Sequence, residues 1–161
     1  MAAAAGAMTE PHVLAHAKRR LFPDDERRRG YAVVDTQFAR ERWLADEPID
    51  PTIRETLAPF NHVRVGTGYP DLVGVRTLDD EWLAADRLGD DPPLVAVEAK
   101  GRTESGRVDV ERGVVQAYDR LHEANAAYVA APAASVSPSA RTLARELNVG
   151  ALGVAADGAV E

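Results

Sequence analysis

The strongest structural signal in the chain is the segment Leu94-Val95-Ala96-Val97-Glu98-Ala99-Lys100-Gly101. Its first four residues form an apolar run that is typical of a buried strand, and the glycine ends it. Side chains alternate across a strand, so Glu98 and Lys100 point to one side and Ala99 to the other. Charged groups are costly at the end of a buried strand unless they are paired or bound. The stretch therefore predicts a central strand whose end carries a functional site.

A third charge accompanies this strand. Asp71 follows the turn-rich segment Gly66-Thr67-Gly68-Tyr69-Pro70 and precedes a second apolar strand, Leu72 to Val75. If the two strands are neighbours, two carboxylates and one ammonium group converge at one edge of the sheet. Such a cluster is typical of a site that binds a metal ion or an ionic ligand.

The rest of the chain shows helical and strand patterns in alternation, which predicts a mixed α/β fold. Helices are expected at His12–Leu21, Asp50–Leu57, Val108–Ala124 and Ser137–Leu147, and strands at Tyr31–Phe38, His62–Val65, Leu72–Val75, Leu94–Val97, Ala126–Ala131 and Val149–Ala155. Asn125 is expected to close the third helix in a left-handed conformation. No linker divides the chain, so residues 9–161 are expected to form a single domain and residues 1–8 a disordered extension.

The composition of the chain excludes several classes of function. The chain has 161 residues and no cysteine, which excludes disulfides and thiolate chemistry. It carries neither a signal-like segment nor an apolar run of about 20 residues, so we expect a cytoplasmic protein with no membrane partner. The formal net charge of −7 argues against a nucleic-acid partner. However, Lys18 to Arg20 and Arg27 to Arg29 form basic clusters, and a metal site needs acidic residues of its own.

The converging charges suggest a specific chemistry. Two carboxylates, Asp71 and Glu98, together with the backbone carbonyl of Ala99, can hold Mg²⁺ (or Mn²⁺), which prefers oxygen ligands. Lys100 could orient an attacking water or stabilise developing charge. Only two of the 19 basic residues are lysines, Lys18 and Lys100. Position 100 thus carries lysine, a compact point charge, in a chain whose other basic residues are nearly all arginine.

These residues resemble the PD-(D/E)XK nuclease superfamily. The likeness rests on Pro70-Asp71, on Glu98-Ala99-Lys100 and on Gln116 and Tyr118 in the following helix, and it covers roughly residues 62 to 155. The best local likenesses are to Holliday-junction-resolvase-like, VRR-NUC-like and restriction-endonuclease-like domains. The resemblance implies a restriction-endonuclease-like core, a central mixed β-sheet flanked by helices in the order αβββαβ. It also implies a divalent-metal-dependent endonuclease that hydrolyses phosphodiester bonds in DNA.

Further residues are candidates for the same site. Glu10 could be an additional metal ligand, although an acidic residue in a first helical turn is also favoured by the helix dipole. Gln116 could position the phosphate or Lys100, and Tyr118 could contact the nucleic acid, although its ring more often packs in the core. Arg102 and Arg107 could touch the DNA backbone, and a solvated face explains them equally well.

Two other functions stay open at this point. The same fold could serve as a catalytically inactive scaffold or nucleic-acid-binding module in a larger complex, with the charges as a structural ion pair. Alternatively, the carboxylates could serve a hydrolase that acts on a small phosphate ester. The sequence leaves open whether the chain forms a homodimer and which form of DNA or RNA it would cut.

Overall fold

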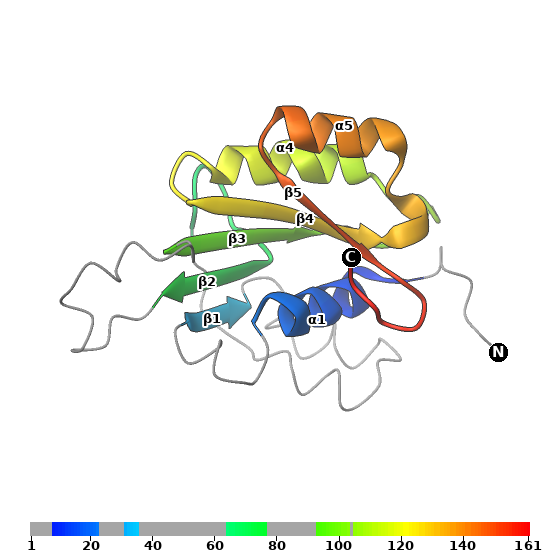
Figure 1. The fold of residues 1–161 in the computed structure, drawn as a ribbon, viewed down its shortest axis with the longest axis horizontal. Helices are drawn as coiled ribbons and strands as arrows, with labels where there is room; N and C mark the ends of the chain where they lie inside the picture. The colour runs from blue at the N-terminus through cyan, green and yellow to red at the C-terminus, as the bar shows by residue number, and fades with distance from the viewer. Residues whose placement is uncertain (1–7, 23–30, 36–63, 77–92, 104) are drawn as a thin grey trace.

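A five-stranded mixed sheet forms the centre of the molecule (Figure 1). The computed structural model describes residues 8–22, 31–35, 64–76, 93–103 and 105–161. The strands lie in chain order across the sheet: β1 (Tyr31–Asp35), β2 (Leu72–Arg76), β3 (Leu94–Ala99), β4 (Ala126–Pro132) and β5 (Gly150–Val154). The pairs β1/β2 and β2/β3 are antiparallel, whereas β3/β4 and β4/β5 are parallel.

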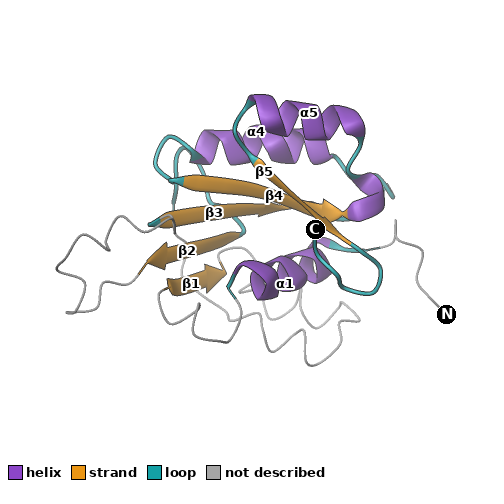
Figure 2. Cartoon of the chain, in the orientation of Figure 1, coloured by secondary structure: helices purple, strands orange, loops and turns teal. Residues whose placement is uncertain are grey.

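Helices cover both faces of this sheet (Figure 2). Helix α1 (Glu10–Leu21) lies on one face, and α4 (Val110–Arg120) and α5 (Pro138–Glu146) lie on the other. The alternation of β3 decides which side chain meets which helix. Val95, Val97 and Ala99 pack in the core cluster with α1, so Glu98 is left on the side of α4. The predicted alternation at the end of β3 is therefore confirmed.

Helix ends follow local sequence signals. The Asp109 side chain accepts a hydrogen bond from the backbone N–H of Arg112, at 3.0 Å, and so caps α4. Ser137 caps α5 in the same way, and Pro138 occupies its first turn as expected. The left-handed residue is Asn148, at φ 57°, after α5.

The expected left-handed conformation of Asn125 is wrong. Its backbone N–H donates to the carbonyl of Leu94 at 2.9 Å, and its Oδ1 accepts from the N–H of Leu94 at 3.1 Å. These two bonds fix Asn125 as the clamp between the start of β3 and the start of β4. Asn125 therefore stabilises the pairing of β3 with β4 and does not cap the helix.

The fold class, an α/β domain with a mixed sheet flanked by helices, is confirmed. The order along the chain, αβββαβαβ, differs from the expected αβββαβ, because α5 and β5 add a further parallel unit beyond β4. The predicted strand at His62–Val65 is also wrong in its described part, since Val65 forms only an isolated bridge with Gly68 across a tight turn. The predicted helix at Asp50–Leu57 and the predicted disorder of residues 1–7 lie outside the described residues.

Candidate metal centre

Asp71 and Glu98 lie side by side where β2 begins and β3 ends. Leu72 is opposite Val97 in the antiparallel register, so the next step brings Asp71 opposite Glu98. The backbone N–H of Asp71 donates to the carbonyl of Val97 at 3.0 Å, which extends the ladder to this point. Both carboxylates are only 2% exposed. The two strands thus place a pair of acidic side chains together below the protein surface.

The electrostatics of this pair favour a bound cation. Burial raises the pKa of Asp71 well above its usual value, and the neighbouring Glu98 and Glu10 carboxylates raise it further. Burial also raises the pKa of Glu98, although Arg120 and Lys100 oppose that shift. Like charges at close range disfavour a doubly ionised pair. A cation between the two carboxylates would relieve the repulsion and lower both pKa values.

One oxygen of Asp71 is positioned for a ligand. Its Oδ2 accepts the backbone N–H of Ala99 at 2.7 Å, which fixes the carboxylate relative to the end of β3. Its Oδ1 is buried and has no hydrogen-bond partner in the described part of the chain. Gln116 Oε1 is the other buried side-chain oxygen there without a partner. Buried acceptors are nearly always satisfied, so an unpaired buried oxygen calls for an explanation such as an ion or a water molecule.

Lys100 follows β3 directly and belongs to the same charge cluster. It lowers the pKa of Glu10, Asp71 and Glu98 through its positive charge. The aliphatic part of its side chain lies against Gly113 of α4, where a Cβ atom would come within 2.7 Å of Lys100 Cγ. Gly113 therefore leaves the space in which the lysine side chain runs between β3 and α4.

Glu10 approaches the same cluster from α1. The pKa of its carboxylate is raised by burial, and the Lys100 charge and the nearby backbone N–H of Gly101 oppose that shift. Gly101 allows this approach, because a Cβ atom there would overlap the backbone of Glu10. Nevertheless, no group of three or more acidic or histidine side chains among the described residues is arranged to hold a metal. The side-chain ligands that fit are therefore the pair Asp71 and Glu98.

Arg120 is the site residue that sequence reasoning missed. Its Nε donates to Glu98 Oε1 at 2.6 Å, and the side chain is 7% exposed. Its Nη1 donates to the carbonyl of Val65 and to Asp119 Oδ2, both at 3.1 Å. Arg120 thus ties the buried carboxylate of Glu98 to the turn that leads into Asp71. The signal in the sequence was spacing: Arg120 lies four residues after Gln116 and seven after Gly113, on the sheet-facing side of α4.

The same turn has a second attachment to α4. Asp119 Oδ2 accepts hydrogen bonds from the backbone N–H and the hydroxyl of Thr67, at 3.0 and 2.7 Å. These bonds hold the pKa of Asp119 below its usual value. Gly68 gives room to the Arg120 guanidinium, since a Cβ atom would come within 2.8 Å of Nη1. The segment read as a simple turn is therefore fitted to α4 by specific contacts.

The three residues expected to contact nucleic acid all lie at the surface. Arg102 and Arg107 are exposed, and their backbones anchor the loop after β3 through bonds to Met8 and Thr103. Tyr118 is 45% exposed, with its ring edge-to-face against His122 at 6.4 Å. The expectation that its ring packs in the core is wrong, because position 118 faces outward when 113 and 120 face the sheet. The structure does not bring Tyr118 together with Gln116.

Two further observations bear on the class of protein. Within the described ranges, none of the helices has the length and apolar character needed to cross a membrane. No family model, curated protein or solved structure matches the chain.

Proposed function

We propose that this protein is a divalent-metal-dependent endonuclease that hydrolyses phosphodiester bonds in DNA, with a site of the PD-(D/E)XK kind. The observation that carries the proposal is the buried, unpartnered Oδ1 of Asp71 beside the carboxylate of Glu98. Lys100 follows β3 and the second unpartnered oxygen, on Gln116, belongs to α4, and these two elements meet where Gly113 lies against Lys100. Buried oxygens without hydrogen-bond partners beside a second carboxylate are more typical of a metal-binding site than of a purely structural core.

The ligand set suits Mg²⁺ or Mn²⁺. Asp71, Glu98 and the carbonyl of Ala99 would hold the ion, and Glu10 would reach it through a water molecule. A site of one or two carboxylates that leaves positions for water and substrate phosphate is what Mg²⁺ requires. When bound, the ion would supply an activated water and polarise the phosphate.

The protein's own residues have separate tasks in this proposal. The Ala99 N–H fixes the rotamer of Asp71, and Arg120 fixes that of Glu98. Lys100 places a compact positive charge where negative charge develops on the phosphate oxygens. Gln116 would orient the phosphate or the ammonium group of Lys100.

The surface around the C-terminal end of β3 would hold the substrate. Arg102 and Arg107 extend into solvent after β3 and would contact the DNA backbone, where each positive charge adds salt-dependent affinity. Tyr118 would contact the nucleic acid only if the strand reaches the outer face of α4. A homodimer, which would allow both strands to be cut, stays a prediction.

A second function is favoured by one observation. Arg120 already neutralises Glu98 within a buried ion pair, as expected of a structural core. The alternative is therefore a catalytically inactive nuclease-fold scaffold or nucleic-acid-binding module, in which Asp71 and Glu98 do not bind metal.

Cleavage assays separate the two functions. We expect purified protein to cut supercoiled plasmid or branched DNA junctions with Mg²⁺ or Mn²⁺ and to leave them intact with EDTA. Asp71→Asn is the matched inactive variant, because the amide keeps the acceptor for the Ala99 N–H while it removes the charge. No cutting by the wild-type protein, together with no Mn²⁺ binding, would favour the scaffold.

A further inference from the structure

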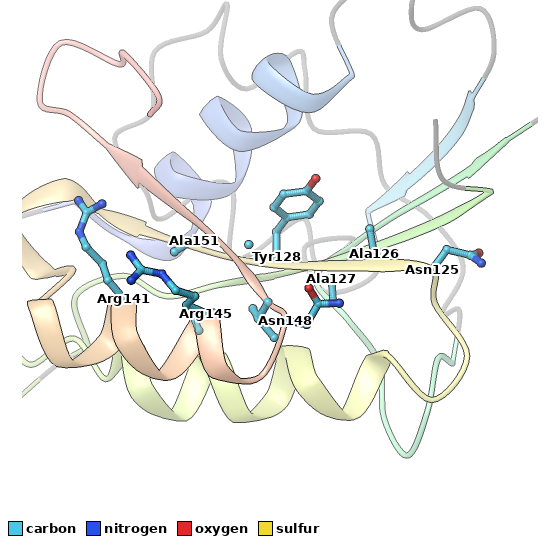
Figure 3. Close-up of a pocket in the computed structure, with 11 residues that line it drawn as sticks. Asn125, Ala126, Ala127, Tyr128, Arg141, Arg145, Asn148 and Ala151 are labelled. Atoms are coloured by element: carbon cyan, nitrogen blue, oxygen red, sulfur yellow. The ribbon is translucent and has the colours of Figure 1, made fainter. Parts of the chain in front are cut away.

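A hollow lies away from the proposed metal centre, between α5 and the beginnings of β4 and β5 (Figure 3). Its volume is about 550 Å³, within the range of small-molecule sites. The parallel register places Ala126 beside Val95 and Ala130 beside Ala99. The hollow therefore lies at the opposite end of the strands from Glu98, and none of the proposed site residues lines it.

The lining of this hollow is basic in an acidic protein. Arg141 and Arg145 lie one helical turn apart on the exposed side of α5, and Figure 3 shows both side chains projecting on the side of β5. In the part of the chain that the structure describes, neither guanidinium pairs with a carboxylate. The lining residues include no Asp or Glu, although the chain has 26 of them. The helix dipole explains a basic residue at position 145 but not the pair.

A neutral polar side chain lies at the rim. Asn125 also borders the hollow, but its side chain is bonded to the Leu94 N–H at the start of β3 and points away from the two arginines (Figure 3). The side chain of Asn148 is exposed at the rim, where the left-handed backbone turns the chain into β5. The remaining walls are formed by small apolar side chains, such as those of Ala144 and Ala151. The hollow thus offers two guanidinium groups, the Asn148 side chain and an apolar wall.

We propose that this hollow binds a phosphate group carried by a nucleotide or by a nucleic-acid strand, with Arg141 and Arg145 as its ligands. Arginine matches phosphate oxygens through paired N–H donors. The volume exceeds what a phosphate alone needs, so the adjoining sugar or base lies against the apolar wall. The site acts in binding and does not depend on cleavage at Asp71 and Glu98.

The test is amide NMR titration of the full chain without divalent metal, using inorganic phosphate, thymidine 5′-monophosphate and a short oligothymidylate as separate probes. We expect saturable shifts at Asn148, Gly150 and Ala151 with a probe that carries a phosphate ester. Saturation with the mononucleotide identifies a nucleotide site, whereas saturation with the strand alone identifies a strand-binding site. Arg141→Gln with Arg145→Gln should weaken binding by about tenfold or more, roughly 1.4 kcal/mol.

A charge-matched control removes the general effect of net charge. Arg20→Gln with Arg64→Gln deletes two exposed arginines outside the hollow and should leave the affinity within about twofold. No saturable shift at the hollow with any probe, or equal weakening by both double variants, would overturn the inference. Cleavage by the same proteins is measured separately with Mg²⁺. Absence of cleavage with intact phosphate binding contradicts only the proposed nuclease, and the converse contradicts only this site.

Discussion

Arg120 offers the sharpest prediction about the architecture of the proposed metal centre. Its guanidinium bonds Glu98 Oε1 at 2.6 Å and Val65 O and Asp119 Oδ2 at 3.1 Å. Replacing Arg120 with Met keeps a long side chain of similar shape and removes all three bonds. It also leaves the 2%-exposed carboxylate of Glu98 without its cation. The variant should therefore be strongly destabilised.

The expected loss in free energy of unfolding follows from the burial of the Arg120–Glu98 pair. Breaking a buried ion pair from one side costs about 3–5 kcal/mol, mainly because the remaining charge is uncompensated. In a domain of this size about 1 kcal/mol corresponds to roughly 2–4 °C in melting temperature. Arg120→Met should thus melt roughly 6–20 °C below the wild type. Adding Glu98→Gln to the same chain should recover much of the loss, because the buried charge is then gone.

Denaturant and thermal unfolding of the two single variants and the double variant measure this as a double-mutant cycle. We expect a coupling free energy of about 2 kcal/mol or more between positions 98 and 120. Asp119→Asn is a control, because it perturbs the exposed side of the same network and should cost less than about 1 kcal/mol. A melting temperature for Arg120→Met within about 2 °C of the wild type would refute the structural role of the pair.

The remaining predictions concern the other charged residues of the centre. Lys100→Arg and Lys100→Met should both fold and bind Mn²⁺, yet lose about a hundredfold or more in single-turnover cleavage, roughly 2.7 kcal/mol; near-normal cutting by Lys100→Arg would show that the lysine is only a counter-ion. Glu10→Gln should lower cleavage by about tenfold if Glu10 completes the site, whereas unchanged turnover with slightly lower thermal stability would assign it to the helix end. Because the pKa of Asp71 is raised in the folded state, its contribution to stability is full at low pH and is lost as the pH rises through that folded pKa. Asp71→Asn should therefore gain stability relative to the wild type as the pH increases in EDTA; melting curves from about pH 4 to about pH 8 measure this, and a constant difference would contradict the raised pKa.

Strong local patterns made much of the fold predictable. The apolar run before Glu98 and the Ser137-Pro138 cap each admit few structures, so β3 and α5 lie where the sequence places them. The failures came from segments whose structure depends on distant partners. Val65 could not be recognised as part of a turn, because Asp119 and Arg120 hold that turn from α4. Asn125 likewise bonds to Leu94, a residue far away in the sequence, so the residues next to Asn125 could not predict its conformation.

The site was predictable to a similar extent. Strand alternation placed Glu98 and Lys100 on one side, and the register of β2 and β3 brings Asp71 to them. Arg120 was missed because its spacing along α4 was its one signal, and arginine on an amphipathic helix is usually solvent-exposed. Its burial becomes evident only when the helix is docked against a strand that carries a glutamate.

The central claim is that Asp71 and Glu98 form a metal centre, and the most direct test is calorimetric titration of Mn²⁺ into the wild type, Asp71→Asn and Glu98→Gln. We predict saturable binding to the wild-type protein, with loss of about tenfold or more in affinity in each variant. Bound metal should also increase the free energy of unfolding of the wild type by about 2.7 kcal/mol when free Mn²⁺ is at a hundred times the dissociation constant. The melting temperature of the wild type should rise accordingly. Equal Mn²⁺ affinity in all three proteins, or no binding to the folded wild type, would contradict the metal centre.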